Sequence, residues 1–223
     1  MKKVLLTFVA AAFIFSCNKK EEVAPVAPEA PKLNSLFKMD GELKDSTGRL
    51  SASSVAVVFG AKGAAFNGAS SYIRIPAEGT IAVPNKLSFS LSFRANYRDV
   101  TQRPRLMQMV DEQGNSIEMH IENSRVVLSN WSEVERKHIV FIMTPTSPDL
   151  LRWHKASATI DFEANVVSLY LNDKLVRTVS NVVLTKPENV KVLLGRRERL
   201  GFDPSDYYLG ELNNLSITEP EVN

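Results

Sequence analysis

Apolar and polar residues alternate along much of the chain beyond residue 34. The alternation is clearest from Leu87 to Arg94, where Leu, Phe, Leu and Phe are each followed by Ser, Ser, Ser or Arg. A strand with one buried face has this period of two, so the segment predicts a half-buried β-strand. The residues from 167 to 171 alternate in the same way, and the turn sequence at 172–174 predicts a hairpin into 175–179.

Residues 65–76 predict the end of one strand, a turn at Gly68, and a second strand that ends at Pro76. Shorter segments before and after this stretch predict further strands. No long segment has helical periodicity. The chain is therefore expected to be all-β, an antiparallel two-sheet β-sandwich. The other expected strands are Leu36–Asp40, Ser54–Phe59, Arg103–Val110, Ser116–Ile121, Arg125–Asn130, Ile139–Met143, His154–Ile160, Val190–Leu194 and Tyr208–Ile217.

The first 17 residues have the pattern of a targeting segment. Two lysines precede an apolar run at residues 4–15, which is too short to span a bilayer. Its end, Ile14-Phe15-Ser16-Cys17, resembles the lipobox of bacterial lipoproteins, although Phe15 is bulkier than that motif usually has. The resemblance implies that Cys17, the single cysteine, carries the lipid anchor. The alternative is an ordinary cleaved secretory signal with an incidental cysteine.

Residues 18–34 are expected to be a tether. The cluster Asn18–Glu22 resembles the surface-export signal of Bacteroidetes lipoproteins, and the proline-rich residues 23–31 favour an extended chain. We therefore expect an outer-membrane lipoprotein that faces the cell exterior, attached to the membrane through its lipid alone. Retention in the periplasm is the alternative.

Residues 35–219 have the length of one all-β domain. The net charge of +2 is too small to indicate a nucleic-acid partner. With one cysteine, the chain has no internal disulfide, so its apolar core must hold the fold together.

Four segments, in this order, resemble the laminin-G-like branch of the concanavalin A-like lectin and glucanase superfamily. They are Leu36–Gly41 with the turn Asp45–Gly48; Phe66–Gly68 with Tyr72–Pro76; Trp153–Asp161 with Leu169–Asp173; and Leu194–Arg196 with Tyr208–Ile217. The resemblance implies a jelly roll. It leaves function open, because the superfamily includes lectins, adhesion domains, glucanases and lyases.

Catalytic motifs of that superfamily do not occur in the sequence. The glucanase string Glu-x-Asp-x-x-Glu is absent, and Asp111-Glu112 fits a solvated turn. His120 is the only candidate for the Gln-Ile-His motif of alginate-lyase-like members, and it lacks the glutamine two positions earlier. The three scattered histidines do not have zinc-ligand spacing. A hydrolase or lyase is therefore the least favoured function.

Many relatives hold a structural calcium, and the corresponding positions here are Asp40, Asn67, Glu211 and Asn213. Calcium favours carboxylates, and only two of the four residues are acidic. We therefore expect no metal and no other cofactor; calcium at these four residues is the alternative.

Binding of a glycan is the favoured function. Trp131 lies among polar residues at a strand end, as a sugar-stacking ring would, although a ring packed under a loop has the same pattern. Arginine recognises carboxylate or sulfate, so an anionic glycan is a possible ligand, with a merely solvated surface as the alternative. The candidate ligand-binding residues are Trp131, Arg94, Tyr97, Arg105, His120 and Arg196.

The sequence thus favours a lipid-anchored, cell-surface, non-catalytic carbohydrate-binding protein, with an exposed aromatic ring near arginines on the concave sheet. The alternative of a different class is a protein–protein interaction or adhesion module of the cell envelope. That alternative predicts an apolar surface patch of several hundred Å².

Overall fold

The computed structural model describes residues 33–96 and 103–220, and all of these belong to one compact unit, residues 32–223. Cys17, the tether before residue 33 and Tyr97 lie outside the described residues. Among the residues that are described, no helix is long and apolar enough to cross a membrane.

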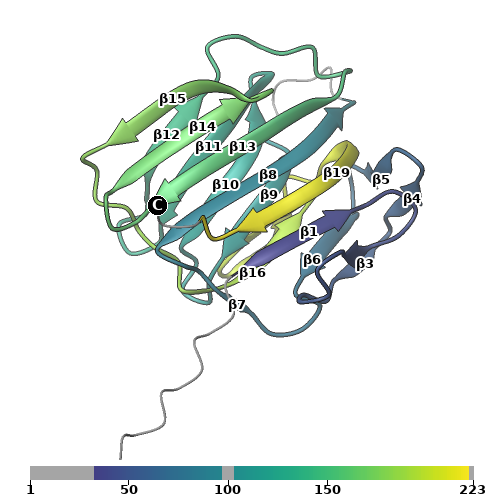
Figure 1. The fold of residues 1–223 in the computed structure, drawn as a ribbon, viewed down its shortest axis with the longest axis horizontal. Coiled ribbons are helices and arrows are strands. Elements are labelled where there is room, and N and C mark those ends of the chain that lie inside the picture. The colour runs from purple at the N-terminus through teal and green to yellow at the C-terminus, as the bar shows by residue number, and fades with distance from the viewer. Residues whose placement is uncertain (1–32, 97–102, 221–223) are drawn as a thin grey trace, which may run out of the picture. The chain divides into compact units, whose positions relative to one another are not determined.

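Two antiparallel sheets form the two layers in Figure 1, and a small hairpin is added to them. The first sheet has the order β15-β14-β13-β8-β19-β1-β2, with β5 on β19 and β4 on β5. Its strands are β1 (Asn34–Lys38), β2 (Lys44–Asp45), β4 (Val58–Gly60), β5 (Gly63–Asn67), β8 (Lys86–Ala95), β13 (His154–Asp161), β14 (Val166–Leu171), β15 (Lys174–Ser180) and β19 (Leu209–Thr218).

The second sheet has the order β12-β11-β10-β9-β16-β6-β3, with β7 beside β16. Its strands are β3 (Ser53–Val55), β6 (Tyr72–Ile75), β7 (Ile81–Ala82), β9 (Arg105–Val110), β10 (Ser116–Glu122), β11 (Arg125–Ser132), β12 (Lys137–Met143) and β16 (Asn189–Leu194). The separate hairpin consists of β17 (Arg197–Arg199) and β18 (Phe202–Ser205).

The core lies between the two sheets and is built from the inward residues of each strand. In β8 the four apolar residues from Leu87 to Phe93 are at most 2% exposed, while the serines between them are partly exposed. The buried apolar side chains of both layers form one cluster. The predicted β-sandwich is confirmed, and the alternation in the sequence is its cause.

One prediction about the strands was wrong, and one hairpin was missed. Ser54–Phe59 was expected to be one strand, but the chain turns at Ala56, whose φ is +52°, and β3 and β4 join different sheets. The β17–β18 hairpin was not predicted, because its residues are mostly polar and have no alternation. This hairpin supplies several residues of the candidate site described below.

Candidate functional site

The β17–β18 hairpin lies against the outer face of the second sheet and is held there by polar contacts. The buried side chain of Gln108 on β9 binds the backbone of Glu198 as a neighbouring strand would. Its Nε2 donates to the Glu198 carbonyl oxygen at 3.0 Å, and its Oε1 accepts from the Glu198 amide at 2.8 Å. At the other end of the hairpin, the Arg105 amide donates to the Asp206 carbonyl oxygen at 3.0 Å.

Below the hairpin, charged side chains on β9 and β10 are buried. Arg105 and Glu118 are each 1% exposed and form an ion pair of 3.0 Å. Arg197 of β17 lies 3.4 Å from the same carboxylate. Burial by itself would raise the pKa of Glu118, but the adjacent guanidinium groups of Arg105 and Arg197 hold it below its usual value. Glu118 therefore remains ionised at neutral pH.

His120 lies on the same face and is also 1% exposed. Its Nε2 is 3.3 Å from a carboxylate oxygen of Glu122, which can only accept, so Nε2 carries the proton. Burial, and then the positive charge of Arg105, lower the pKa of His120 to about 2. The ring is therefore neutral. Its unprotonated Nδ1 has no hydrogen-bond partner among the described residues.

Trp131 forms a partly open aromatic surface at the end of β11. Its ring is half-buried, with the edge of His138 against it at 4.9 Å between centroids, and its Nε1 donates to Glu133 at 2.8 Å. Arg199 from the hairpin lies 5.5 Å from the Trp131 centroid and 5.1 Å from that of Phe202. Phe202 is 65% exposed, so this group, which we call the Trp131 platform (Trp131, Arg199 and Phe202), faces solvent.

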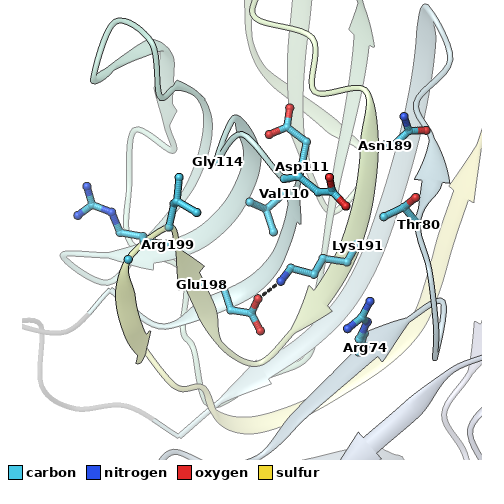
Figure 2. A pocket seen from close by; sticks show the side chains of 12 residues that line it. Arg74, Thr80, Val110, Asp111, Gly114, Asn189, Lys191, Glu198 and Arg199 are labelled. Carbon is cyan, nitrogen blue, oxygen red and sulfur yellow. Dashed lines mark ion pairs between the residues drawn. The ribbon is translucent and has the colours of Figure 1, made fainter.

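A hollow of about 310 Å³ lies between the hairpin and the outer face of the second sheet (Figure 2). Arg199 belongs both to its lining and to the Trp131 platform. The charges that line the hollow are balanced, with three cationic residues and three carboxylates. Figure 2 shows two of them, Lys191 and Glu198, paired with one another. The lining includes Arg74, Lys191, Arg199, Asp111, Glu112 and Glu198.

A family model described as the concanavalin A-like lectin/glucanases superfamily matches residues 67–222. The chain belongs to this superfamily. A search of curated proteins found no match. The resemblance seen in the sequence is thereby confirmed at the level of the family.

Solved structures share the concanavalin A-like fold at low identity. Domain 4 of AbnA, an extracellular arabinanase from Geobacillus stearothermophilus solved with arabinotriose, is 19% identical with a TM-score of 0.61 over 84% of this chain and 92% of its own. The binding domain of botulinum neurotoxin serotype D is 16% identical with a TM-score of 0.62 over 86% of this chain and 49% of its own. A structure of botulinum neurotoxin type C, reported for cell entry that depends on interaction with two ganglioside molecules, is 15% identical. Its TM-score is 0.65 over 86% of this chain and 48% of its own.

The present chain therefore spans about half the length of the neurotoxin domains and nearly the whole arabinanase domain. At these identities the likeness shows the concanavalin A-like fold alone. The site must be argued from the chain's own residues.

The arginines expected to bind an anion do not come together on this concanavalin A-like domain. Arg94 lies on β8 of the first sheet, where it forms an ion pair of 2.5 Å with Glu211. Arg105 points away from the core but is buried, with Asp206 at the end of the hairpin 3.7 Å from it, and His120 is equally buried. Arg196 is 3.4 Å from the Tyr72 ring centroid and pairs with Glu198.

Three of the four residues considered for calcium already make polar contacts with other residues of the chain. The Asn67 Oδ1 accepts from three backbone amides, at residues 69, 70 and 71. The Asn213 Oδ1 accepts from the amides of Met39 and Asn214, and Glu211 pairs with Arg94. Asp40 is exposed. Within the described residues, no group of three or more His, Cys, Asp or Glu side chains could hold a metal.

Proposed function

We propose that the domain binds carbohydrate at the Trp131 platform, with the adjoining hollow receiving the hydroxyl groups. The observation that carries this proposal is that the Trp131 ring is fixed by Glu133 and His138 yet remains partly open beside Arg199 and Phe202. A fixed aromatic face that adjoins a polar hollow suits the apolar and hydroxyl-bearing sides of a sugar ring. The shared fold with a domain solved with arabinotriose supports the same class of ligand.

The charges of this hollow favour a neutral sugar over an anionic one. Its cations and carboxylates are equal in number, and Lys191 is neutralised by Glu198. Burial would raise the pKa of Glu198, but hydrogen bonding and charge from Lys191, and then Arg196, lower it. Glycoside hydrolysis needs one protonated carboxyl group as its acid, and an ionised Glu198 does not supply it. Glu198 is therefore not a candidate for such an acid.

The test uses the fact that the chain has only two tryptophans. In a Trp153→Phe variant of residues 32–223, Trp131 is the only indole reporter. Binding of a neutral oligosaccharide from an array screen should change its fluorescence. Trp131→Ala, made in the otherwise unchanged domain and measured by calorimetric titration, should weaken binding about tenfold or more with a melting temperature within a few degrees of wild type. Trp153→Ala is the matched control and should bind like wild type. Equal binding by Trp131→Ala would overturn the proposal.

A protein-docking role is the second candidate, and the exposed apolar tip of the hairpin favours it. Leu200 and Phe202 are 63% and 65% exposed. This role predicts a blank glycan array, together with capture of an envelope protein that a Leu200→Ser, Phe202→Ser double variant loses.

We also propose that Cys17 is lipidated and holds the domain on the outer membrane, facing outward. The lipobox-like sequence and the proline-rich tether support this. In cells fed an alkyne fatty acid, the full chain should become labelled and Cys17→Ser should not. Protease added to intact cells should remove the domain. Labelling of Cys17→Ser would refute lipidation at this residue, and full protection would refute the outward orientation.

A further inference from the structure

A second hollow, of about 460 Å³, lies on the outer face of the first sheet. Lys155 on β13, Ser92 on β8 and Asn213 on β19 are direct neighbours in register and together form one row of its lining. Trp153 and Lys62 also line it. The two sheets lie between this hollow and the Trp131 platform.

The second hollow is positively charged, unlike the first. Among the described residues, its lining contains two lysines and no carboxylate. Lys155 pairs with Asp173 at 2.8 Å, but that carboxylate is 73% exposed, so the pair is weak. Lys62 has no ion-pair partner in the described part of the chain. The lining therefore attracts an anion.

The walls of the hollow are fixed in the free protein. His154 Nε2 donates to the Asp149 carbonyl oxygen at 2.8 Å, and its Nδ1 accepts from the Asn172 amide at 3.0 Å. Asn213 Nδ2 donates to the Lys62 carbonyl oxygen at 3.1 Å. At Gly63, with φ of +143°, a Cβ would lie 2.5 Å from the Leu212 carbonyl oxygen, so only glycine lets β5 approach β19 beside Lys62.

A β-bulge supplies an unpaired polar group to the same hollow. The pairing of β19 with β8 shifts register between Asn213 and Ser216, and Asn214 there has a φ of +49°. A bulge redirects the side chain of its extra residue. The Asn214 side chain lines the hollow and makes no hydrogen bond to the described residues. An amide in this position can both donate to and accept from a sugar hydroxyl.

We propose that this hollow is a second carbohydrate site, specific for a sugar unit that carries a carboxylate or a sulfate. Trp153 provides the stacking surface, Lys62 and Lys155 bind the anionic group, and Asn214 binds a hydroxyl. The site is independent of the Trp131 platform and gives the domain two binding faces with different charge preferences.

The test uses a Trp131→Phe variant of residues 32–223, in which Trp153 is the only tryptophan. Its fluorescence is titrated with trigalacturonate, dextran sulfate and neutral dextran. At least one anionic ligand should change the signal and dextran should not. Raising the salt from about 50 mM to about 500 mM should weaken binding several-fold. The stronger of the two anionic ligands identifies carboxylate or sulfate.

Lys62→Ala in the same background should weaken binding about threefold or more. Lys174→Ala, which removes an exposed lysine on β15 outside the hollow, is the matched control and should have no effect. The proposal is overturned if neither anionic ligand changes the signal, if dextran binds equally well, or if the two lysine variants behave alike. None of these results bears on neutral-sugar binding at Trp131, which is measured with the other tryptophan.

Discussion

Replacement of Asp45 by asparagine tests how the first turn of the domain is stabilised. The Asp45 side chain is 3% exposed and accepts five hydrogen bonds. One oxygen accepts from the amides of Leu36 and Thr47, and the other accepts from the Thr47 hydroxyl and the amides of Arg49 and Leu50. An asparagine amide would direct N–H groups at two or three of these donors, depending on which oxygen the NH2 group replaces.

The lowered pKa of Asp45 gives the size of its contribution to the free energy of unfolding. Burial alone would raise this pKa, but the hydrogen bonds from Thr47, Leu50 and Leu36 lower it from 3.8 to about 2. At about 1.36 kcal/mol per pH unit, ionised Asp45 stabilises the fold by about 2 kcal/mol at neutral pH. Asp45→Asn should therefore lower the free energy of unfolding by about 2 kcal/mol and the melting temperature by roughly 4–8 °C.

Urea denaturation from pH 7 to pH 2 is the assay, with Asp40→Asn as the control at an exposed aspartate. Because the folded-state pKa is depressed, the contribution of Asp45 is complete above about pH 4 and is lost as the pH falls towards 2. The difference in free energy of unfolding between wild type and Asp45→Asn should thus be constant around neutral pH and fall to nearly zero near pH 2. A difference below about 0.5 kcal/mol at pH 7, or one that persists to pH 2, would refute the reasoning.

Three further changes test the hairpin, the buried ion pair beneath it, and the close approach of β19 to β8 in the first sheet. Glu118→Gln should destabilise the domain by about 3–5 kcal/mol, since Arg105 and Arg197 then keep only the Asp206 carboxylate, 3.7 Å from each. The double change Arg105→Leu, Glu118→Leu should recover most of the loss in urea denaturation. Gln108→Ala should speed hydrogen exchange at the Glu198 amide about tenfold or more and leave the amide of Ile117 unchanged. The two bonds to the Glu198 backbone hold the hairpin, whereas the remaining Gln108 bond, to Glu118 Oε1 at 3.1 Å, joins two side chains. Gly210→Ala should cost about 3 kcal/mol or more, because its Cβ would lie 2.3 Å from the Arg94 carbonyl oxygen; Gly79→Ala, with open space around it, should cost about 1 kcal/mol.

The sequence predicts the layers of this fold far better than its sites. Alternation identifies β8 because its serines remain partly exposed and its apolar residues face the core. The same alternation occurs in β10, where Glu118 and His120 stand between apolar residues, and it predicts a solvated outer face. The structure instead buries both side chains. Arg197 of the hairpin lies against Glu118, and His120 contacts Glu122 and the Phe141 ring.

The hairpin itself gives little signal in the sequence. Its strands are three and four residues long, and it attaches through Gln108, Arg105 and Arg197 rather than through apolar side chains. Such attachment depends on pairing residues about 90 positions apart, which no local pattern encodes. Trp131 could be singled out from its polar neighbours, but Arg199 and Phe202 could not be assigned to it without the hairpin.

The separation of the two proposed sites constrains how the domain engages a glycan. Stacked sheets lie about 10 Å apart, and the sites are on the two outer faces, so a short oligosaccharide cannot occupy both at once. Two sites that no single short ligand can bridge add no avidity toward it. A long polymer with neutral and acidic stretches could reach both sites by wrapping around the domain or by linking two copies. Binding to such a polymer should therefore fall when either Trp131 or Lys62 is changed, whereas each short ligand should respond to one change only.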